Sequence, residues 1–107
     1  MIRGCIFYEN TEAPERFGII NTGRPVVVVS NRIFGKAVQV VPLTSSEAKL
    51  SQEDDLHVPV CVNGRDSIAL CEQIRTVHIQ ELSRAPKGRC SDDELAQIDA
   101  ALEEMLF

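Results

Sequence analysis

The sequence predicts a mainly β fold with one C-terminal α-helix, an α+β arrangement, and two observations predict it. Short apolar runs rich in β-branched residues, separated by Gly, Pro and Asn, fill residues 1–90, and this pattern is typical of strands joined by turns. The apolar spacing then changes to that of a helix over residues 91–106. Strands followed by one helix in a small chain favour a compact β-barrel or half-barrel with the helix packed on it.

The strands are expected where the apolar runs lie. Residues 4–9 are aromatic and apolar, and residues 25–31 hold four consecutive valines, a run too short for a helix and typical of a strand buried on both faces. Residues 37–43 form the next run, in which Pro42 favours a strand end or an edge strand. Two further strands are expected over residues 56–62 and from residue 67 towards residue 77.

Polar segments separate these runs. Residues 10–24 and 83–90 are expected to be irregular, residues 31–35 to turn, and Asn63-Gly64 is a turn signal. Residues 44–55 are polar and charged, so we expect a long exposed loop there. Loops of that length in a compact domain are often functional.

The terminal helix has both a start signal and an apolar stripe. Ser91 with Glu94 three residues later forms a capping box, and Leu95, Ile98 and Leu102 recur at helical spacing. We therefore expect one amphipathic helix over residues 91–106. The whole chain, residues 1–107, is expected to be a single domain in which residues 1–90 are mostly β-barrel and loops.

Composition and charge exclude several classes of protein. The 107 residues are 44% hydrophobic and 25% charged, with a mean hydropathy of −0.05, which excludes a disordered chain. No apolar run approaches the ~18 residues of a membrane span, and the first residues do not resemble a signal peptide, so we expect a cytoplasmic protein with no membrane partner. The net charge is −5, but residues 91–107 hold six acids and no base, and the rest holds 10 acids and 11 bases. That nearly neutral body can carry a local basic patch.

The four cysteines, Cys5, Cys61, Cys71 and Cys90, have no C-x-x-C spacing, so no metal site is expected. The first three lie in apolar runs and are expected to be buried, reduced thiols. A nucleophilic cysteine served by His57 or His78 is the alternative, although no sequence around a cysteine supports it. Otherwise each histidine is expected to be a half-buried strand residue.

One pair of side chains stands at two strand ends. Arg24 lies where a Gly-containing loop meets the valine run, and Thr44 begins the Thr-Ser-Ser segment that ends the next run. If the two strands are neighbours, a guanidinium and a hydroxyl converge on one anion. The alternative is a surface arginine and an unrelated turn threonine.

Several blocks of sequence together resemble one known family. They are residues 1–8 (MIRGCIFY), 23–31 (GRPVVVVSN), 40–45 (VVPLTS), 57–58 (HV) and 69–77 (ALCEQIRTV), followed by the terminal helix. In this order and spacing they resemble the PemK/MazF family of toxins from type II toxin–antitoxin systems, along nearly the whole chain.

The resemblance implies an SH3-like barrel of the PemK/MazF/CcdB type that works as a homodimer. It implies an mRNA interferase, a sequence-specific endoribonuclease that needs neither metal nor cofactor. Such an enzyme cuts single-stranded RNA through attack by the 2′-hydroxyl and leaves 2′,3′-cyclic phosphate and 5′-hydroxyl ends. It also implies a MazE/PemI-like antitoxin whose disordered tail occupies the RNA groove, and a toxin–antitoxin complex that binds operator DNA.

The resemblance also implies roles for particular residues. Arg24 matches the catalytic arginine, whose planar fork suits a pentacoordinate phosphate, and Thr44 matches the catalytic threonine, which donates to a phosphate oxygen. Glu72 matches a position where some members carry an acidic base, although a carboxylate paired with Arg75 for structure is the alternative. The residues expected to contact substrate or fix the groove floor are Ser45, Gln73 and Arg75, with a purely structural ion pair as the alternative for Arg75.

One segment departs from the family pattern, and two other functions stay open. Residues 18–23 read GIINTG where the family has G-x-E-Q-x-G; this loop helps frame the RNA path, so the change bears on the cleaved sequence but leaves Arg24 and Thr44 in place. The first rival is a non-enzymatic gyrase inhibitor of the CcdB branch, whose Trp-Gly-Ile ending this chain lacks. The second is a barrel that has lost catalysis and only binds a partner.

Overall fold

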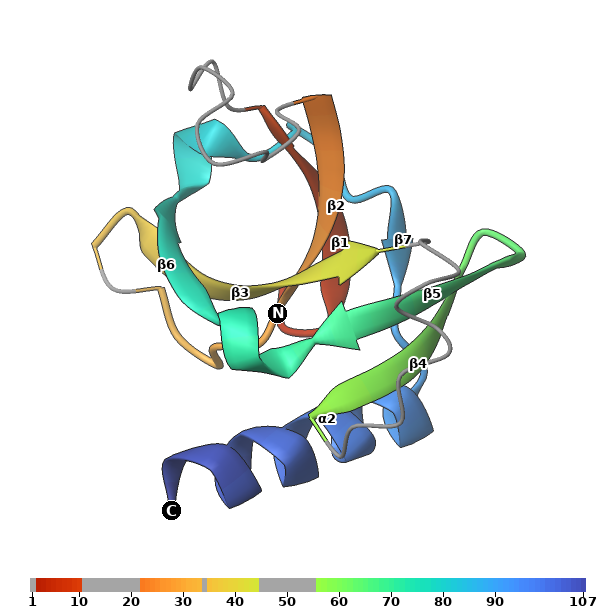
Figure 1. Cartoon of the computed structure of the whole chain (residues 1–107). Coiled ribbons are helices and arrows are strands. Elements are labelled where there is room, and N and C mark those ends of the chain that lie inside the picture. The colour runs from red at the N-terminus through yellow and green to blue at the C-terminus, as the bar shows by residue number, and fades with distance from the viewer. Residues whose placement is uncertain (1, 11–21, 34, 45–55) are drawn as a thin grey trace.

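The strands of the protein curl into a half-barrel, and one helix packs against it (Figure 1). The computed structural model describes residues 2–10, 22–33, 35–44 and 56–107. In chain order the elements are β1 (Cys5–Asn10), β2 (Thr22–Val28), β3 (Ala37–Thr44), β4 (His57–Val62), β5 (Arg65–Leu70), the 3₁₀ turn η1 (Cys71–Gln73), β6 (Arg75–His78), the 3₁₀ turn η2 (Ile79–Glu81), β7 (Gly88–Arg89) and α2 (Asp92–Leu106). The predicted mainly β fold with a C-terminal helix is confirmed. No helix within these described ranges is long and apolar enough to cross a membrane.

The sheet is antiparallel and centres on β3. Its strands run in the order β4-β5-β3-β2-β1-β7, and β6 pairs with β3 beside that path. One edge of β3 pairs with β6 over residues 37–40 and then with β5 over residues 43–44. Pro42 has no N–H to donate, and it lies in the gap between these two ladders. Of the two alternatives for Pro42, the edge strand is wrong because β3 is central, whereas a position near a strand end is correct because β3 ends two residues later.

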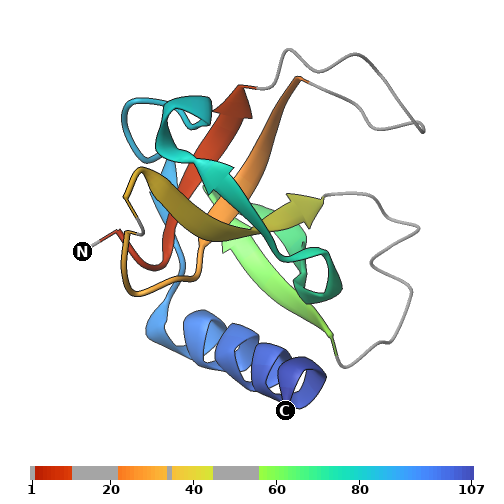
Figure 2. The same cartoon turned by 90° about the vertical axis from the view of Figure 1, so that its left-hand side faces the viewer.

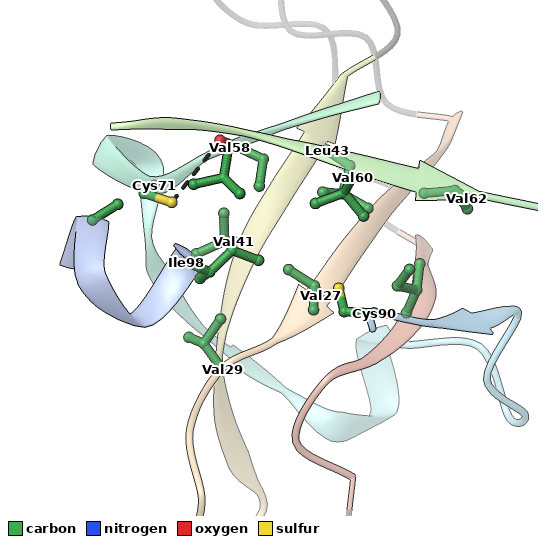
Figure 3. Packing of buried hydrophobic residues seen from close by; sticks show 13 residues of the cluster. Val27, Val29, Val41, Leu43, Val58, Val60, Val62, Cys71, Cys90 and Ile98 are labelled. Atoms are coloured by element: carbon green, nitrogen blue, oxygen red, sulfur yellow. Dashed lines mark hydrogen bonds between the residues drawn. The ribbon is translucent and has the colours of Figure 1, made fainter. Parts of the chain in front are cut away.

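Alternate residues of the central strands feed two hydrophobic cores. Val27 and Val41 belong to the core between the sheet and α2, where Figure 3 shows Ile98 of the helix pointing towards Val41. Val26 and Val40 belong to a second core inside the curl of β1, β2, β3 and β6. These four residues, two from β2 and two from β3, are 0% exposed. The prediction that the valine run is buried on both faces is confirmed, and the reason is the two-residue period of a strand.

The helix begins as the sequence predicts and is tied to the barrel by polar contacts. The Ser91 hydroxyl accepts from the Glu94 amide at 3.1 Å, and Glu94 Oε1 accepts from the Ser91 amide at 2.8 Å, which completes the capping box. Glu94 Oε2 accepts from the Cys61 amide of β4 at 2.7 Å. The guanidinium of Arg3 donates to both carboxylate oxygens of Asp99.

Several boundaries differ from the sequence expectations. Strand β2 begins at Thr22, inside the segment 10–24 that was expected to be irregular, because β1 pairs with it as far as Thr22. The run after residue 67 is two strands separated by η1. Strand β7 lies in a segment expected to be irregular, where pairing with β1 overrides local sequence. The Asn63-Gly64 turn is confirmed, with both residues at positive φ (51° and 81°).

Candidate functional site

Arg24 lies at the start of β2 and is partly buried. Its direct neighbour on β1 is Glu9, so the two side chains stand on the same face of the sheet. Two residues further along β2, Val26 lies on that same face and enters the core inside the curl. Arg24 is therefore the point where this apolar face becomes charged.

Thr44 ends β3 on the same face as Arg24. The β2–β3 ladder pairs Val26 with Pro42, and two residues further along the antiparallel strands are Arg24 and Thr44. Because side chains alternate along a strand, both point to the face of Val26 and Pro42. Figure 2 shows the start of β2 and the end of β3 on one side of the molecule. The structure thus places the guanidinium-bearing and hydroxyl-bearing residues that the sequence singles out on one face of two neighbouring strands, two residues beyond the last pair of their ladder.

A second pair of polar residues belongs to the same face. His57 begins β4 opposite Leu70 of β5, while Thr44 lies opposite Ile68 of that strand. Leu70 and Ile68 are two residues apart, so His57 and Thr44 share a face. His57 Nε2 lies 3.1 Å from Oε1 of Glu72, with the histidine side chain 6% exposed and the glutamate side chain 33% exposed. The imidazole thereby holds the carboxylate at the edge of the site.

A third pair of polar residues spans the open end of the curl. Arg75, the first residue of β6, donates through Nη2 to Oε1 of Glu9 on β1. The Glu9 side chain is 5% exposed and that of Arg75 is 44% exposed. Because Arg75 pairs with Glu9 and Glu72 pairs with His57, the expected alternative of a Glu72–Arg75 pair is wrong for the described residues.

The other expected site residues divide into two groups. Gln73 lies in η1, is exposed, and immediately follows Glu72. Ser45 lies outside the described residues, as do the rest of the predicted loop 44–55 beyond Thr44 and positions 18–21 of the segment that departs from the family pattern. Within the described residues, no group of three or more His, Cys, Asp and Glu is placed to hold a metal ion.

Two of the four cysteines, Cys71 and Cys90, are unsuited to the role of a nucleophile. Burial, with a smaller contribution from the Glu72 carboxylate, raises the pKa of the Cys71 thiol to about 12, and burial also raises the pKa of Cys90 to about 11. Both thiols therefore stay protonated at neutral pH and are poor nucleophiles. Cys71 and Cys90 are buried and Cys5 is partly buried, but Cys61 is exposed. The expectation of a buried Cys61 was wrong because this residue stands on the outer face of β4.

Sequence reasoning missed Glu9 and the contact between His57 and Glu72. The signal for Glu9 was present, because it is an acid at the end of an aromatic and apolar strand run. An acid at such a position requires a cation beside it. The contact of His57 with Glu72 joins residues 15 apart in the sequence, and no local pattern reports it.

Comparison with known proteins places the chain in a family. Residues 2–106 match the model of the PemK-like, MazF-like toxin of type II toxin–antitoxin systems. The chain belongs to the PemK/MazF toxin family. It is 38% identical over 112 residues to a Mycobacterium tuberculosis protein named Endoribonuclease MazF9, an alignment that covers 96% of this chain and 93% of that protein. The resemblance stated from the sequence blocks is confirmed.

Solved structures of PemK/MazF toxins share the fold. The Deinococcus radiodurans MazF crystal structure has a TM-score of 0.75 at 18% identity, covering 97% of this chain and 94% of that one. A mycobacterial endoribonuclease solved in complex with its cognate antitoxin also has a TM-score of 0.75, at 19% identity, covering 99% of this chain and 94% of that one. At such identities the likeness concerns the fold, in which a half-barrel carries a C-terminal helix.

Proposed function

We propose that this PemK/MazF chain is the toxin of a toxin–antitoxin system and a metal-independent endoribonuclease that cleaves single-stranded mRNA at specific sequences. The observation that carries the proposal is the shared face of Arg24 and Thr44 at neighbouring strand ends. Family membership supports it, as does the name of the mycobacterial relative. The products would be a 2′,3′-cyclic phosphate and a 5′-hydroxyl.

The proposed reaction is a transesterification within the RNA. The 2′-hydroxyl gives up its proton and its oxygen attacks the adjacent phosphorus, negative charge builds on the non-bridging oxygens, and the bond to the 5′-oxygen breaks as that oxygen takes up a proton from water. This chemistry needs a proton acceptor, a stabiliser of charge and a proton donor. Arg24 supplies a planar fork of N–H donors for the non-bridging oxygens, and Thr44 donates its hydroxyl hydrogen to one of them.

Glu72 is the proposed proton acceptor. An arginine keeps its proton at neutral pH and is a poor base there, so a carboxylate suits this role better. Glu72 has one oxygen held by the nearly buried His57, while a third of its side chain stays exposed. A carboxylate that is both oriented and accessible fits a general base. Its partner His57 lies on the face that Thr44 also occupies.

The remaining candidates serve the path of the RNA. Gln73 is exposed beside Glu72, and Arg75 stays 44% exposed although it pairs with Glu9. Both are proposed to contact the backbone or bases of the bound strand, together with Ser45. Because the body outside the C-terminal helix is nearly neutral in net charge, the local cations Arg24 and Arg75 can attract a phosphodiester chain.

We further propose a MazE/PemI-like antitoxin as partner, a homodimer as the working form, and binding of operator DNA by the toxin–antitoxin complex. A structural neighbour solved with its cognate antitoxin supports the first of these. Among the described residues, Ile33, Ile79, Leu106 and Phe107 are large apolar side chains left exposed, and such surface suits protein partners. Light scattering tests the dimer, and a result of monomer alone would count against it.

The decisive experiment is cleavage of single-stranded RNA by the purified protein in EDTA. We expect fragments that end in 2′,3′-cyclic phosphate, identified by mass spectrometry, and no such fragments with Arg24→Ala. Absence of cleavage by the wild-type protein, or equal cleavage by the variant, would overturn the mechanism. A circular dichroism melt of each protein shows that both are folded when assayed.

A further inference from the structure

A buried carboxylate, that of Glu9, is paired with one arginine and stands opposite a second in the sheet register. Glu9 is 4% exposed, and it is the only acid buried to this extent among the described residues. Burying an ionised carboxylate is costly unless it is paired and hydrogen-bonded. Arg75 satisfies Oε1, but Oε2 is buried and has no hydrogen-bond partner among the described residues. Half of this carboxylate therefore lacks the partner that its burial demands.

Arg24 is the cation placed to supply that partner. It lies directly opposite Glu9 in the β1–β2 ladder. Opposite residues in an antiparallel pair have Cβ atoms about 4.5–5.5 Å apart, a gap that side chains as long as Glu and Arg readily bridge. Its guanidinium forms no ion pair with any residue of the described ranges. Among the described residues, Oε2 of Glu9 therefore lacks a donor, and the guanidinium of Arg24, the residue opposite, lacks an acidic partner.

We propose that Glu9 is a positioning residue for Arg24, so that its Oε2 accepts from one edge of the guanidinium and the other edge stays available to the phosphate. This inference rests on the proposed function, in which Arg24 binds the reacting phosphodiester. A guanidinium has five N–H donors in a fixed fork, which is enough for a carboxylate on one edge and a phosphate on the other. Arg75 completes the arrangement by holding Oε1 from the opposite side.

This arrangement explains why an acid can stand beside a site for an anion. One carboxylate with two guanidiniums leaves one net positive charge, so the open end of the curl still attracts a phosphodiester. An arginine without an anchor moves among many rotamers, whereas an anchored one presents its donors where charge develops. A displacement of about 1 Å at a reacting centre can cost about 100-fold in rate.

The kinetic test compares two substitutions of an acid by its amide. Glu9→Gln keeps the side-chain shape and removes the charge, and we expect kcat for RNA cleavage to fall about 100-fold with a smaller change in KM. Asp99→Asn is the matched control, because it removes the partner of Arg3 on α2 and should leave kcat unchanged. Glu9→Asp, which keeps the charge, should restore part of the lost kcat. A folded Glu9→Gln protein with wild-type kcat would overturn the proposal.

A second measurement does not depend on catalysis, and its decisive signal is read from the wild-type protein. In the 15N spectrum of the wild-type protein, the Nε–Hε signal of Arg24, assigned by its loss in Arg24→Lys, should persist at neutral pH because the anchored guanidinium exchanges slowly. The same signal should broaden or vanish in Glu9→Gln. A wild-type Arg24 signal that exchanges as fast as that of exposed Arg32 would overturn the role of Glu9. If RNA is not cleaved at all, the proposed function fails while this spectrum still decides the contact.

Discussion

Nε2 of His57 lies 3.1 Å from Oε1 of Glu72, and this contact joins the first residue of β4 to the 3₁₀ turn that follows β5. The histidine side chain is 6% exposed, so its position is fixed by packing. Since an ionised carboxylate only accepts hydrogen bonds, the imidazole donates through Nε2 whenever Glu72 is ionised. Glu72 is thus oriented without losing its access to solvent, which is the state that a general base needs.

The first prediction concerns the base. Glu72→Gln should lower kcat about 100-fold, because general base catalysis contributes about 10²–10⁴-fold. It should also remove the rise of kcat/KM with pH on the acid side of the profile, since an amide does not titrate. Glu81→Gln, an exposed residue of η2, is the control and should leave both unchanged. A pH profile that Glu72→Gln does not alter would assign this residue a structural role.

The second prediction concerns the shape of the cation in the site. Arg24→Lys keeps the charge but removes the fork, so we expect cleavage to fall about 10²–10³-fold, as when one fixed donor to a developing anion is lost. The melting temperature should change little, because Arg24 is only partly buried at the start of β2. Arg32→Lys, in the exposed turn beyond the other end of β2, is the matched control. Equal activity of the two variants would remove Arg24 from the mechanism.

The third prediction concerns the hydroxyl. Thr44→Val replaces one hydroxyl by a methyl group of similar size, and kcat should fall about 100-fold while RNA still binds. Thr76→Val, at an exposed position of β6, should cleave like the wild type. Gel-shift binding and cleavage measured on the same RNA separate the two effects. Loss of binding with no loss of kcat would make Thr44 a substrate contact rather than a catalytic residue.

The fourth prediction concerns how α2 is attached. Ser91→Ala removes the side chain that caps the helix and should lower the free energy of unfolding by about 1 kcal/mol. Ser91→Gly should cost less, since glycine is tolerated as a cap. RNA cleavage should be unchanged in both, because the helix packs on the core face away from Arg24. Urea unfolding measures the stability, and equal stability of wild type and Ser91→Ala would contradict the prediction.

Local chemistry made some parts of the fold predictable and left others out of reach. The capping box of Ser91 and Glu94 and the Asn63-Gly64 turn are short-range signals, and the structure contains both. Strand β7 and the exact start of β2 depend on pairing with β1, which no local pattern reports. For the site, strand alternation explains why Arg24 and Thr44 share a face once their strands are paired. The roles of both residues stay predictions.

The pairing of charges in the site was harder to predict than its members. Glu72 and Arg75 are close in sequence, and a pair between them was one of the two alternatives for Glu72. They diverge because η1 ends between them, which leaves Glu72 beside β4 and sends Arg75 across the curl to Glu9. Arg75 and Glu9 are 66 positions apart in the sequence, and they meet only because the sheet curls. Such contacts are a property of the assembled barrel rather than of any segment.

The fifth prediction concerns stability in alkali. Burial raises the pKa of the Cys71 thiol from 9.0 to about 12. Below pH 9 this thiol is protonated in both the folded and the unfolded protein, so in that range it does not make the free energy of unfolding depend on pH. Between these values the unfolded thiol ionises while the folded one keeps its proton, and stability falls with rising pH by about 1.4 kcal/mol per pH unit. Urea unfolding from pH 8 to pH 10.5 measures this slope.

Two cysteine variants isolate that contribution from the other groups that titrate in alkali. Cys71→Ala should lose stability at every pH, because a buried side chain is truncated, but its stability should decline less steeply above pH 9 than that of the wild type. Cys61→Ala should keep the wild-type slope, since Cys61 is exposed in the folded protein. Equal slopes for wild type and Cys71→Ala would mean that the thiol of Cys71 ionises as readily in the folded protein as in the unfolded chain, and that water reaches it through the core between the sheet and α2.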